Sequence, residues 1–364
     1  MNDVESPQKG QLEQTQVRIW LWVVYSMIFC MVVIGGITRL TGSGLSMVEW
    51  RPLMGTLPPL SQEEWGRVFE LYKQSPQYQE VNTWMNLGDF KHIFFWEYLH
   101  RLFGRLIGLV FGVPWLYFIV RKKLKDKNLR RTTIALMLGG SQGLLGWYMV
   151  KSGLVDRPEV SHLRLAAHLS LAFFVGMWVF WSILALHPPM ISGVIVKSRT
   201  LPKLAVKNIG RATVGFLLLL GIQIVYGAFM AGTRAGYMYQ TFPTLNGAWI
   251  APQWGAMGPW WVDVTNNPDS IHFLHRSMGW LLLLFGGILV KKLWSHEATR
   301  WGSILLGMGL MIQFALGVAT IVFGMPISIA AAHQGGAFLL LSITTLLLFV
   351  LHSIKSNWTG SALT

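Results

Sequence analysis

Eight long apolar runs dominate this sequence and decide what kind of fold it can adopt. Each has about 20 residues or more, the length that an α-helix needs to cross the hydrocarbon core of a bilayer. Only helices and closed barrels satisfy their backbone hydrogen bonds there, and no run alternates as a barrel strand does. We therefore expect an all-α polytopic membrane protein with eight transmembrane helices, at residues 19–38, 92–120, 132–151, 162–186, 211–231, 271–290, 302–323 and 327–352.

The composition indicates the same class of protein. Of the 364 residues, 52% are hydrophobic and only 13% are charged, which is too apolar for a soluble domain of this length. The single cysteine, Cys30, excludes an intramolecular disulfide and a cysteine metal cluster. The first 18 residues are polar and resemble neither a signal peptide nor a transit peptide. We expect a multi-pass protein of a bacterial inner (plasma) membrane.

Positive charge is concentrated in short segments that follow every second apolar run. Segment 121–131 alone carries seven of the 30 lysines and arginines, and cytoplasmic loops of membrane proteins hold such an excess. We therefore expect both termini to be cytoplasmic. Topology and contact with anionic lipid of the bilayer explain the net charge of +14, so this charge does not indicate a nucleic-acid partner.

Two patterns from the first half of the chain recur in the second half. Leu-His-Arg contains His100 and then His275, and Ala-Ala-His contains His168 and then His333. Each half has an even number of runs, so both halves enter the membrane from the same side. We expect two parallel-repeat four-helix bundles. The domains would be a cytoplasmic N-terminal segment 1–18, an N-terminal bundle 19–186, a cytoplasmic linker 187–210, a C-terminal bundle 211–352 and a cytoplasmic tail 353–364.

The four repeated histidines lie near the start of even-numbered runs, which places them all in the outer half of the membrane. An ionisable side chain at membrane depth is costly and by default marks a functional site. Two imidazoles at similar depth on different helices can fill the two axial positions of a haem iron. A lone membrane histidine more often hydrogen-bonds a neighbouring helix, but four in a duplicated pattern favour one haem in each half.

Arginines accompany these histidines. Arg101 and Arg276 directly follow a histidine, and Arg39 and Arg234 lie at the ends of neighbouring apolar runs. A guanidinium group matches a carboxylate in geometry, so all four are candidate partners of haem propionates. Snorkelling to lipid headgroups is the alternative, and for Arg39 the spacing leaves it open.

The two halves carry different residues at the position three residues before the histidine of the Leu-His-Arg pattern. Glu97 precedes His100, whereas His272 precedes His275, and residues three apart share a helix face. A carboxylate beside a haem could accept protons, orient a ligand histidine, or pair with Arg101. Spacing alone does not decide among these roles. Glu97 is the candidate catalytic residue.

Taken together, several segments resemble the haem A synthase (Cox15/CtaA) family over essentially all eight runs. The segments are Gly35–Ser46, Glu97–Arg101, His168, His275–Arg276 and Ala332–Gln334. The resemblance implies oxidation of a methyl group of haem O to the formyl group of haem A, for cytochrome oxidase biogenesis. Some relatives carry a cysteine pair in an outer loop. This chain has only Cys30, so a step that needs such a pair cannot operate here.

The resemblance also implies a role for each half. A b-type haem would be the cofactor of the C-terminal half, bound by His275, His333, Arg276 and Arg234. The N-terminal half would receive the substrate haem at His100, His168, Arg101 and Arg39.

The expected partners are haem O as substrate, a haem O synthase upstream, and an electron acceptor that the sequence does not identify. A homo-oligomer is compatible with the sequence. The alternative function is a diheme b-type membrane electron-transfer protein with the same ligands and no chemistry on the macrocycle, and a third class is a haem or small-molecule transporter. The Glu97 and His272 difference favours the enzyme.

Overall fold

The computed structural model describes residues 7–49, 57–151, 153, 158–186, 189–198 and 200–358. The regular structure in these ranges is helical. The long helices are α1 (Pro7–Leu40), α4 (Leu87–Val120), α5 (Asp126–Lys151), α6 (His162–Leu184), α8 (Lys203–Thr233), α10 (Pro268–Trp294), α11 (Arg300–Val322) and α12 (Ile327–Trp358). The short ones are α2 (Gln62–Lys73), α3 (Pro76–Glu80), α7 (Pro189–Ser198), η2 (Ala235–Tyr237), α9 (Trp260–Asn266) and η3 (Glu297–Thr299).

Seven helices of the described chain are long and apolar enough to cross a membrane, namely α1, α4, α6, α8, α10, α11 and α12. The chain is therefore an all-helical, multi-pass membrane protein. The eighth expected span, 132–151, lies within α5, which has 26 residues. Glycine, serine and glutamine at 139–143 make α5 less apolar than the other seven helices, so its crossing stays a prediction.

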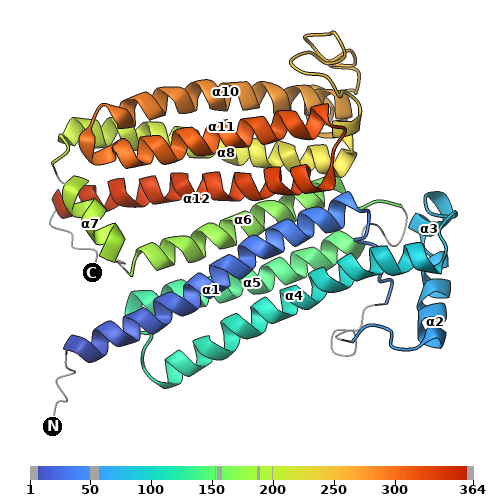
Figure 1. Cartoon of the computed structure of the whole chain (residues 1–364), viewed down its shortest axis with the longest axis horizontal. Coiled ribbons are helices and arrows are strands. Elements are labelled where there is room, and N and C mark those ends of the chain that lie inside the picture. Colours follow the sequence, from blue (N-terminus) through green and yellow to red (C-terminus); the bar gives the residue numbers. More distant parts are fainter. Residues whose placement is uncertain are drawn as a thin grey trace.

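The long helices form two adjacent groups (Figure 1). In the first, α1 packs on α4 and α6, and α5 packs on α6. In the second, α8, α10, α11 and α12 form a closed ring in which each helix contacts the next. Between the groups, α6 contacts α8, and α12 contacts α1 and α6.

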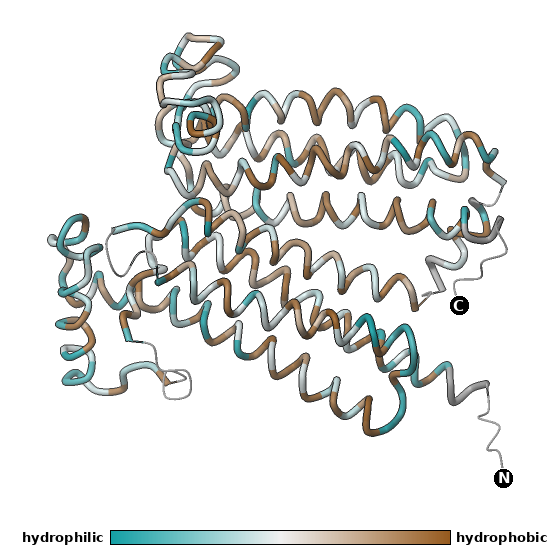
Figure 2. The backbone as a smooth tube through the Cα atoms, turned by 180° about the vertical axis from the view of Figure 1, so that it is seen from behind, coloured by the Kyte–Doolittle hydropathy of each residue, from teal (hydrophilic) through white to brown (hydrophobic). Residues whose placement is uncertain are grey.

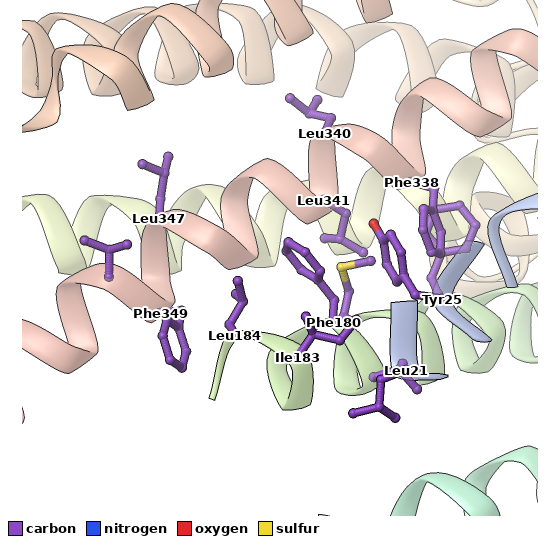
Figure 3. Packing of buried hydrophobic residues seen from close by; sticks show 14 of the residues in the cluster. Leu21, Tyr25, Phe180, Ile183, Leu184, Phe338, Leu340, Leu341, Leu347 and Phe349 are labelled. Carbon is purple, nitrogen blue, oxygen red and sulfur yellow. The ribbon is translucent and has the colours of Figure 1, made fainter. Parts of the chain in front are cut away.

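The joint between the groups is a dense apolar core contributed by α1, α6 and α12 (Figure 3). Phe338 lies so close to Gly176 that a Cβ atom added there would be 2.6 Å from the Phe338 ring. Tyr25 and Ser342 share a hydrogen bond of 2.6 Å across the joint. Because lipid tails are as apolar as these side chains, close packing and buried hydrogen bonds, rather than exclusion of water, hold the joint together.

Asparagine caps begin two of the long helices at the same end of the molecule. The Asn86 side chain accepts from the backbone N–H groups of Gly88 and Asp89, and the Asp89 carboxylate accepts from the Asn86 N–H, which completes a capping box. Asn267 caps α10 in a similar way, with Pro268 in the first turn. These caps fix the residues at which α4 and α10 begin, and these two helices carry His100 and His275.

The connecting segments are distributed unequally between the two ends of the bundle. Helices α2 and α3 and the long segment between α8 and α10 lie at one end, and the start of α1 and the end of α12 lie at the other (Figure 1). Hydrophilic residues gather at both ends, with apolar residues along the helices between them (Figure 2). This distribution is what a bilayer-spanning bundle requires.

Candidate functional site

One cavity of about 1280 Å³ extends through both helix groups. Its lining includes His100 of α4, His168 of α6, His275 of α10 and His333 of α12. It also includes the other site residues that the sequence predicts, which are Arg39, Glu97, Arg101, Arg234 and Arg276. The structure thus brings all nine candidates, which lie far apart in the sequence, to one internal surface.

The two histidines of the second group lie at a spacing that suits two ligands of one haem iron. The ring centres of His275 and His333 are 6.5 Å apart, and the ring planes make an angle of 83°. A metal–imidazole bond is about 2 Å long, so two ring centres on opposite sides of one iron are separated by about 6 Å.

Buried nitrogens in this cavity also fit a haem. The Nδ1 atoms of His168, His275 and His333 are buried and have no hydrogen-bond partner among the described residues. A buried polar atom without a partner is unfavourable, and native structures rarely tolerate it without a ligand or another functional reason. The four histidines line this cavity, and imidazole is a ligand type that suits haem iron.

Three histidines are held by the same motif on a neighbouring helix, Gln-x-x-x-Gly. In each case the glutamine side-chain N–H donates to the backbone carbonyl of the histidine at 2.9–3.0 Å, and a Cβ atom added at the glycine would lie 2.9–3.4 Å from the ring. The sets are Gln142, Gly146 and His168; Gln223, Gly227 and His275; and Gln313, Gly317 and His333. At Gly146 and Gly317 a larger side chain would press on the imidazole, whereas at Gly227 an added Cβ atom would only reach contact with the ring.

His100 departs from this motif. Gly35 of α1 approaches its ring in the usual way, at 3.5 Å from Nε2 to an added Cβ atom, but Met31 occupies the position four residues before that glycine. A thioether is only a weak acceptor and carries no N–H group to donate to the His100 carbonyl. Sequence reasoning did not identify the glutamines as site residues, although Gln-x-x-x-Gly occurring before three of the four histidines was a usable signal.

Glu97 is buried, with 2% of its surface exposed, and three donors surround its carboxylate. Ser46 Oγ and the Met47 N–H donate to Oε2 at 2.7 Å, and Arg101 Nη2 donates to Oε1 at 2.5 Å. Arg101 also donates to the Met47 carbonyl at 3.1 Å. Of the roles that spacing left open, pairing with Arg101 is the one that the geometry displays, and the pair fastens the segment after α1 onto α4.

The second group repeats this arrangement with different chemistry. His272, which replaces Glu97, is fully buried, and its Nδ1 lies 2.9 Å from the Ala235 carbonyl. Arg276 Nε donates to His272 Nε2 at 2.9 Å, and its other nitrogens donate to the carbonyls of Tyr239 and Thr244 at 2.8 and 3.0 Å. In both groups, therefore, the arginine after the histidine holds the segment that follows the neighbouring helix.

Arg39 and Arg234 lie at the junction of the two groups. Arg39 of α1 donates to the carbonyls of Ala231 and Gly232 at 3.0 and 2.9 Å, and so satisfies backbone acceptors that the end of α8 leaves unpaired. Arg234 ends α8 in a left-handed conformation and forms an ion pair of 2.9 Å with Glu159. Both arginines therefore connect the two helix groups and also line the cavity.

A further link runs through the residue beside His333. Gln334 Nε2 donates to the Val32 carbonyl of α1 at 2.7 Å. Gly36 allows this approach, because a Cβ atom added there would lie 2.9 Å from the Gln334 side-chain oxygen. The turn of α12 that carries His333 is thereby attached to a helix of the other group.

Above the second group, outside the membrane-spanning segments, Asp263 organises the long loop before α10. Burial acts to raise the pKa of Asp263, but hydrogen bonds from Asn267, Ser270 and the backbone N–H groups of Met257 and Gly255 outweigh it and lower the pKa to about 2. The ionised carboxylate therefore stabilises this loop at all but acidic pH.

Comparison with known proteins assigns the chain to a family. The sequence profile of COX15-CtaA, described as "Cytochrome oxidase assembly protein", matches residues 18–345. A protein of Nitrosospira multiformis named "Heme A synthase" is 42% identical over 349 residues, which cover 94% of each chain. A protein of the same name from Nitrosomonas eutropha is 42% identical over 330 residues, covering 89% of this chain and 90% of the relative.

A third protein named "Heme A synthase", from Rhodospirillum centenum, is 39% identical over 362 residues, which cover 98% of this chain and 92% of the relative. The profile match and these near-full-length similarities, on a helical membrane fold with paired histidines in one cavity, lead to one conclusion: this chain belongs to the haem A synthase (COX15-CtaA) family.

Proposed function

We propose that this protein is a membrane haem A synthase, an oxidoreductase that converts a methyl group of haem O into the formyl group of haem A for cytochrome oxidase biogenesis. The near-full-length similarity to proteins named "Heme A synthase" supports the reaction. The structural observation that carries the proposal is the single cavity lined by two histidines from each helix group. Forming a formyl group removes electrons and adds oxygen, so the reaction also needs an electron acceptor and an oxygen source.

We infer that the second group holds a resident haem b on His275 and His333. The 6.5 Å separation of the ring centres and the two buried Nδ1 atoms support this assignment. When bound, the haem would supply a redox-active iron. The chain's own contribution is rigidity, because Gln223 and Gln313 fix the backbone of each ligand from a neighbouring helix.

The substrate haem is assigned to His100 and His168 of the first group. His168 has the glutamine anchor and His100 lacks it, so the first group offers one firmly held ligand and one held less firmly. A substrate that must enter and leave is better served by such a site than by two fixed ligands. Glu97 lines this part of the cavity, and we assign it to catalysis through its hold on Arg101 and the segment above.

We further propose that the two groups are parallel four-helix repeats with eight crossings, α5 included. The start of α1 and the end of α12 lie at the same end of the molecule, which requires an even number of crossings (Figure 1). The shared Gln-x-x-x-Gly contacts of His168 and His333 support the repeat. The bacterial inner membrane, cytoplasmic termini and a haem O synthase as supplier of substrate belong to the same proposal.

Pigment extraction tests this function. Cells that make the protein together with a source of haem O should accumulate formyl-bearing haem, and the His168→Ala variant should accumulate far less. Appearance of unmodified haem alone, with both histidine pairs occupied by haem b, would instead favour the diheme electron-transfer protein.

A further inference from the structure

The two helix groups differ most at one matched pair of helix contacts. Helices α10 and α11 pack closely along their length, whereas their counterparts α4 and α5 make few contacts with each other. Aligning the groups on their histidines and glutamines pairs Gly108 with Leu283, Gly139 with Leu310, and Gly143 with Phe314. We call the line between α4 and α5 marked by these three glycines the seam.

Large side chains close the corresponding line in the second group. Leu310 of α11 fills the space beside Gly286 of α10, where an added Cβ atom would lie 2.3 Å from a Leu310 methyl carbon. Phe314 of α11 contacts Trp280 of α10 with ring centres 4.9 Å apart. Every described α10 or α11 residue that lines the cavity is buried or half-buried, so the second group is sealed on this side.

The seam is open. A Cβ atom added at Gly108, Gly139 or Gly143 would meet nothing within 4 Å. Several residues of α4 and α5 line the cavity and are also exposed at the protein surface, namely Gly108, Gly139, Gly140, Gly143, Leu144 and Trp147. The cavity therefore reaches the apolar surface of the first group, where lipid surrounds a membrane protein.

The inner end of the seam is at His168, a candidate axial ligand. Gly146 touches the His168 ring, and Gly143 and Gly139 follow about one and two helical turns along α5. Residues of α5 line the cavity from Val150 to Ala135, and the part from Gly146 to Ala135 is roughly 16 Å long. His168 lines the cavity at this end, and imidazole is a ligand type that haem iron takes.

We propose that the seam holds the isoprenoid side chain of the substrate haem and leads it out to the lipid. This inference rests on the proposed function, because haem O differs from haem b in carrying one long isoprenoid chain on its rim. A long, flexible, apolar chain that starts at the rim of the macrocycle needs an apolar path that begins beside the bound haem. The first group provides such a path and the second, filled by Leu310 and Phe314, does not, so the seam also distinguishes a tailed substrate from a tailless cofactor.

Filling the seam with the side chains of the second group tests the proposal. Gly143→Phe and Gly139→Leu are the test variants. Gly287→Leu is the matched control, because Gly287 is an exposed helical glycine of α10 with nothing within 4 Å of an added Cβ atom and is not in the cavity lining. Protein loaded with haem b and reconstituted in lipid nanodiscs is titrated with haem O and, separately, with haem B, and binding is followed by absorbance and by extraction of retained pigment.

Both test variants should bind haem O at least about tenfold more weakly than the wild type, since losing burial of only two methylene groups weakens binding by that factor. Their binding of haem B to the first group should stay within about twofold of the wild type, because the macrocycle does not use the seam. The control should match the wild type for both haems. Retention of haem b in the second group reports that each variant is folded, and the two variants fill adjacent turns of the seam separately.

Unchanged haem O affinity in both folded variants, or equal loss of haem O and haem B, would overturn the proposal. The proposed function fails separately: wild-type protein that binds haem O through the seam but never forms haem A would contradict the function and leave the seam assignment intact. If both variants still form haem A and bind haem O as tightly as the wild type, the seam assignment is contradicted and the proposed function stands.

Discussion

Replacing Glu97 by alanine should destabilise the protein as well as impair catalysis. The carboxylate is 2% exposed and accepts from Ser46, Met47 and Arg101, so the change leaves a largely buried cation, whose side chain is 15% exposed, and two other donors without this acceptor. Breaking a buried ion pair typically costs about 3–5 kcal/mol. Arg101 keeps its bond to the Met47 carbonyl, which places the expected loss near the lower figure, about 3 kcal/mol.

Thermal unfolding of the purified protein in detergent measures this loss, which should lower the melting temperature by roughly 5 °C or more. Glu49→Ala is the matched control. It removes a carboxylate two residues from Met47, but its ion pair with Arg67 is exposed on both sides, and such pairs contribute at most about 1 kcal/mol. Haem b should remain in the second group of both variants at low temperature, whereas haem A formation should collapse only in Glu97→Ala. Equal melting temperatures for Glu97→Ala and wild type, or an equal fall in melting temperature in Glu97→Ala and Glu49→Ala, would refute this reasoning.

Three further predictions address the resident haem, the outer loop and the topology. His275→Ala should lose most of the copurifying haem b, measured by pigment extraction, whereas His100→Ala should keep it; the reverse would exchange the roles of the two groups. Hydrogen bonds lower the folded-state pKa of Asp263 to about 2, below the unfolded value of about 4. The stability that Asp263 contributes is therefore complete above about pH 4 and is lost as the pH falls from about 4 to 2. Proteolysis of the loop should accelerate over this pH range in the wild type and should not depend on pH there in Asp263→Asn. Reporter fusions after Lys127 should report the cytoplasm and fusions near Tyr78 the outer compartment, and the opposite pattern would invert the proposed orientation.

Hydropathy located the helices well because the signal is local. The run expected at 211–231 lies inside α8, and the run expected at 92–120 lies inside α4. Several observed helices are longer than predicted, since α8 begins at Lys203 and α1 at Pro7, where polar residues continue the helix beyond the apolar stretch, whereas α6 ends two residues earlier than predicted, at Leu184. Hydropathy detects the part of a helix in lipid and is insensitive to turns that project from it. The linker expected at 187–210 likewise contains α7.

The cavity lining was predictable where it repeats in the sequence. The histidines and the arginines beside them, which line one cavity, were singled out because the same residues recur in both halves. Two partners of Arg276, the carbonyls of Tyr239 and Thr244, were not predictable, because their positions depend on the conformation of the loop after α8. The glutamine anchors were missed for a different reason: which helix faces Gln223 is a property of packing, and sequence spacing does not contain it.

The joint between the groups imposes an order on the biogenesis of this protein. Tyr25 of α1 and Ser342 of α12 form their hydrogen bond across 317 residues of chain. At 5–20 residues per second, the ribosome needs roughly 15 to 60 seconds to make that interval. The first helix can pack on α4 and α6 earlier, but the part of its surface that contacts α12 stays unmatched in the bilayer until the last helix is inserted. A chain truncated after α11 would lack α12 and so leave the joint open in both groups. The two halves made as separate polypeptides would instead have all the surfaces needed to reassemble.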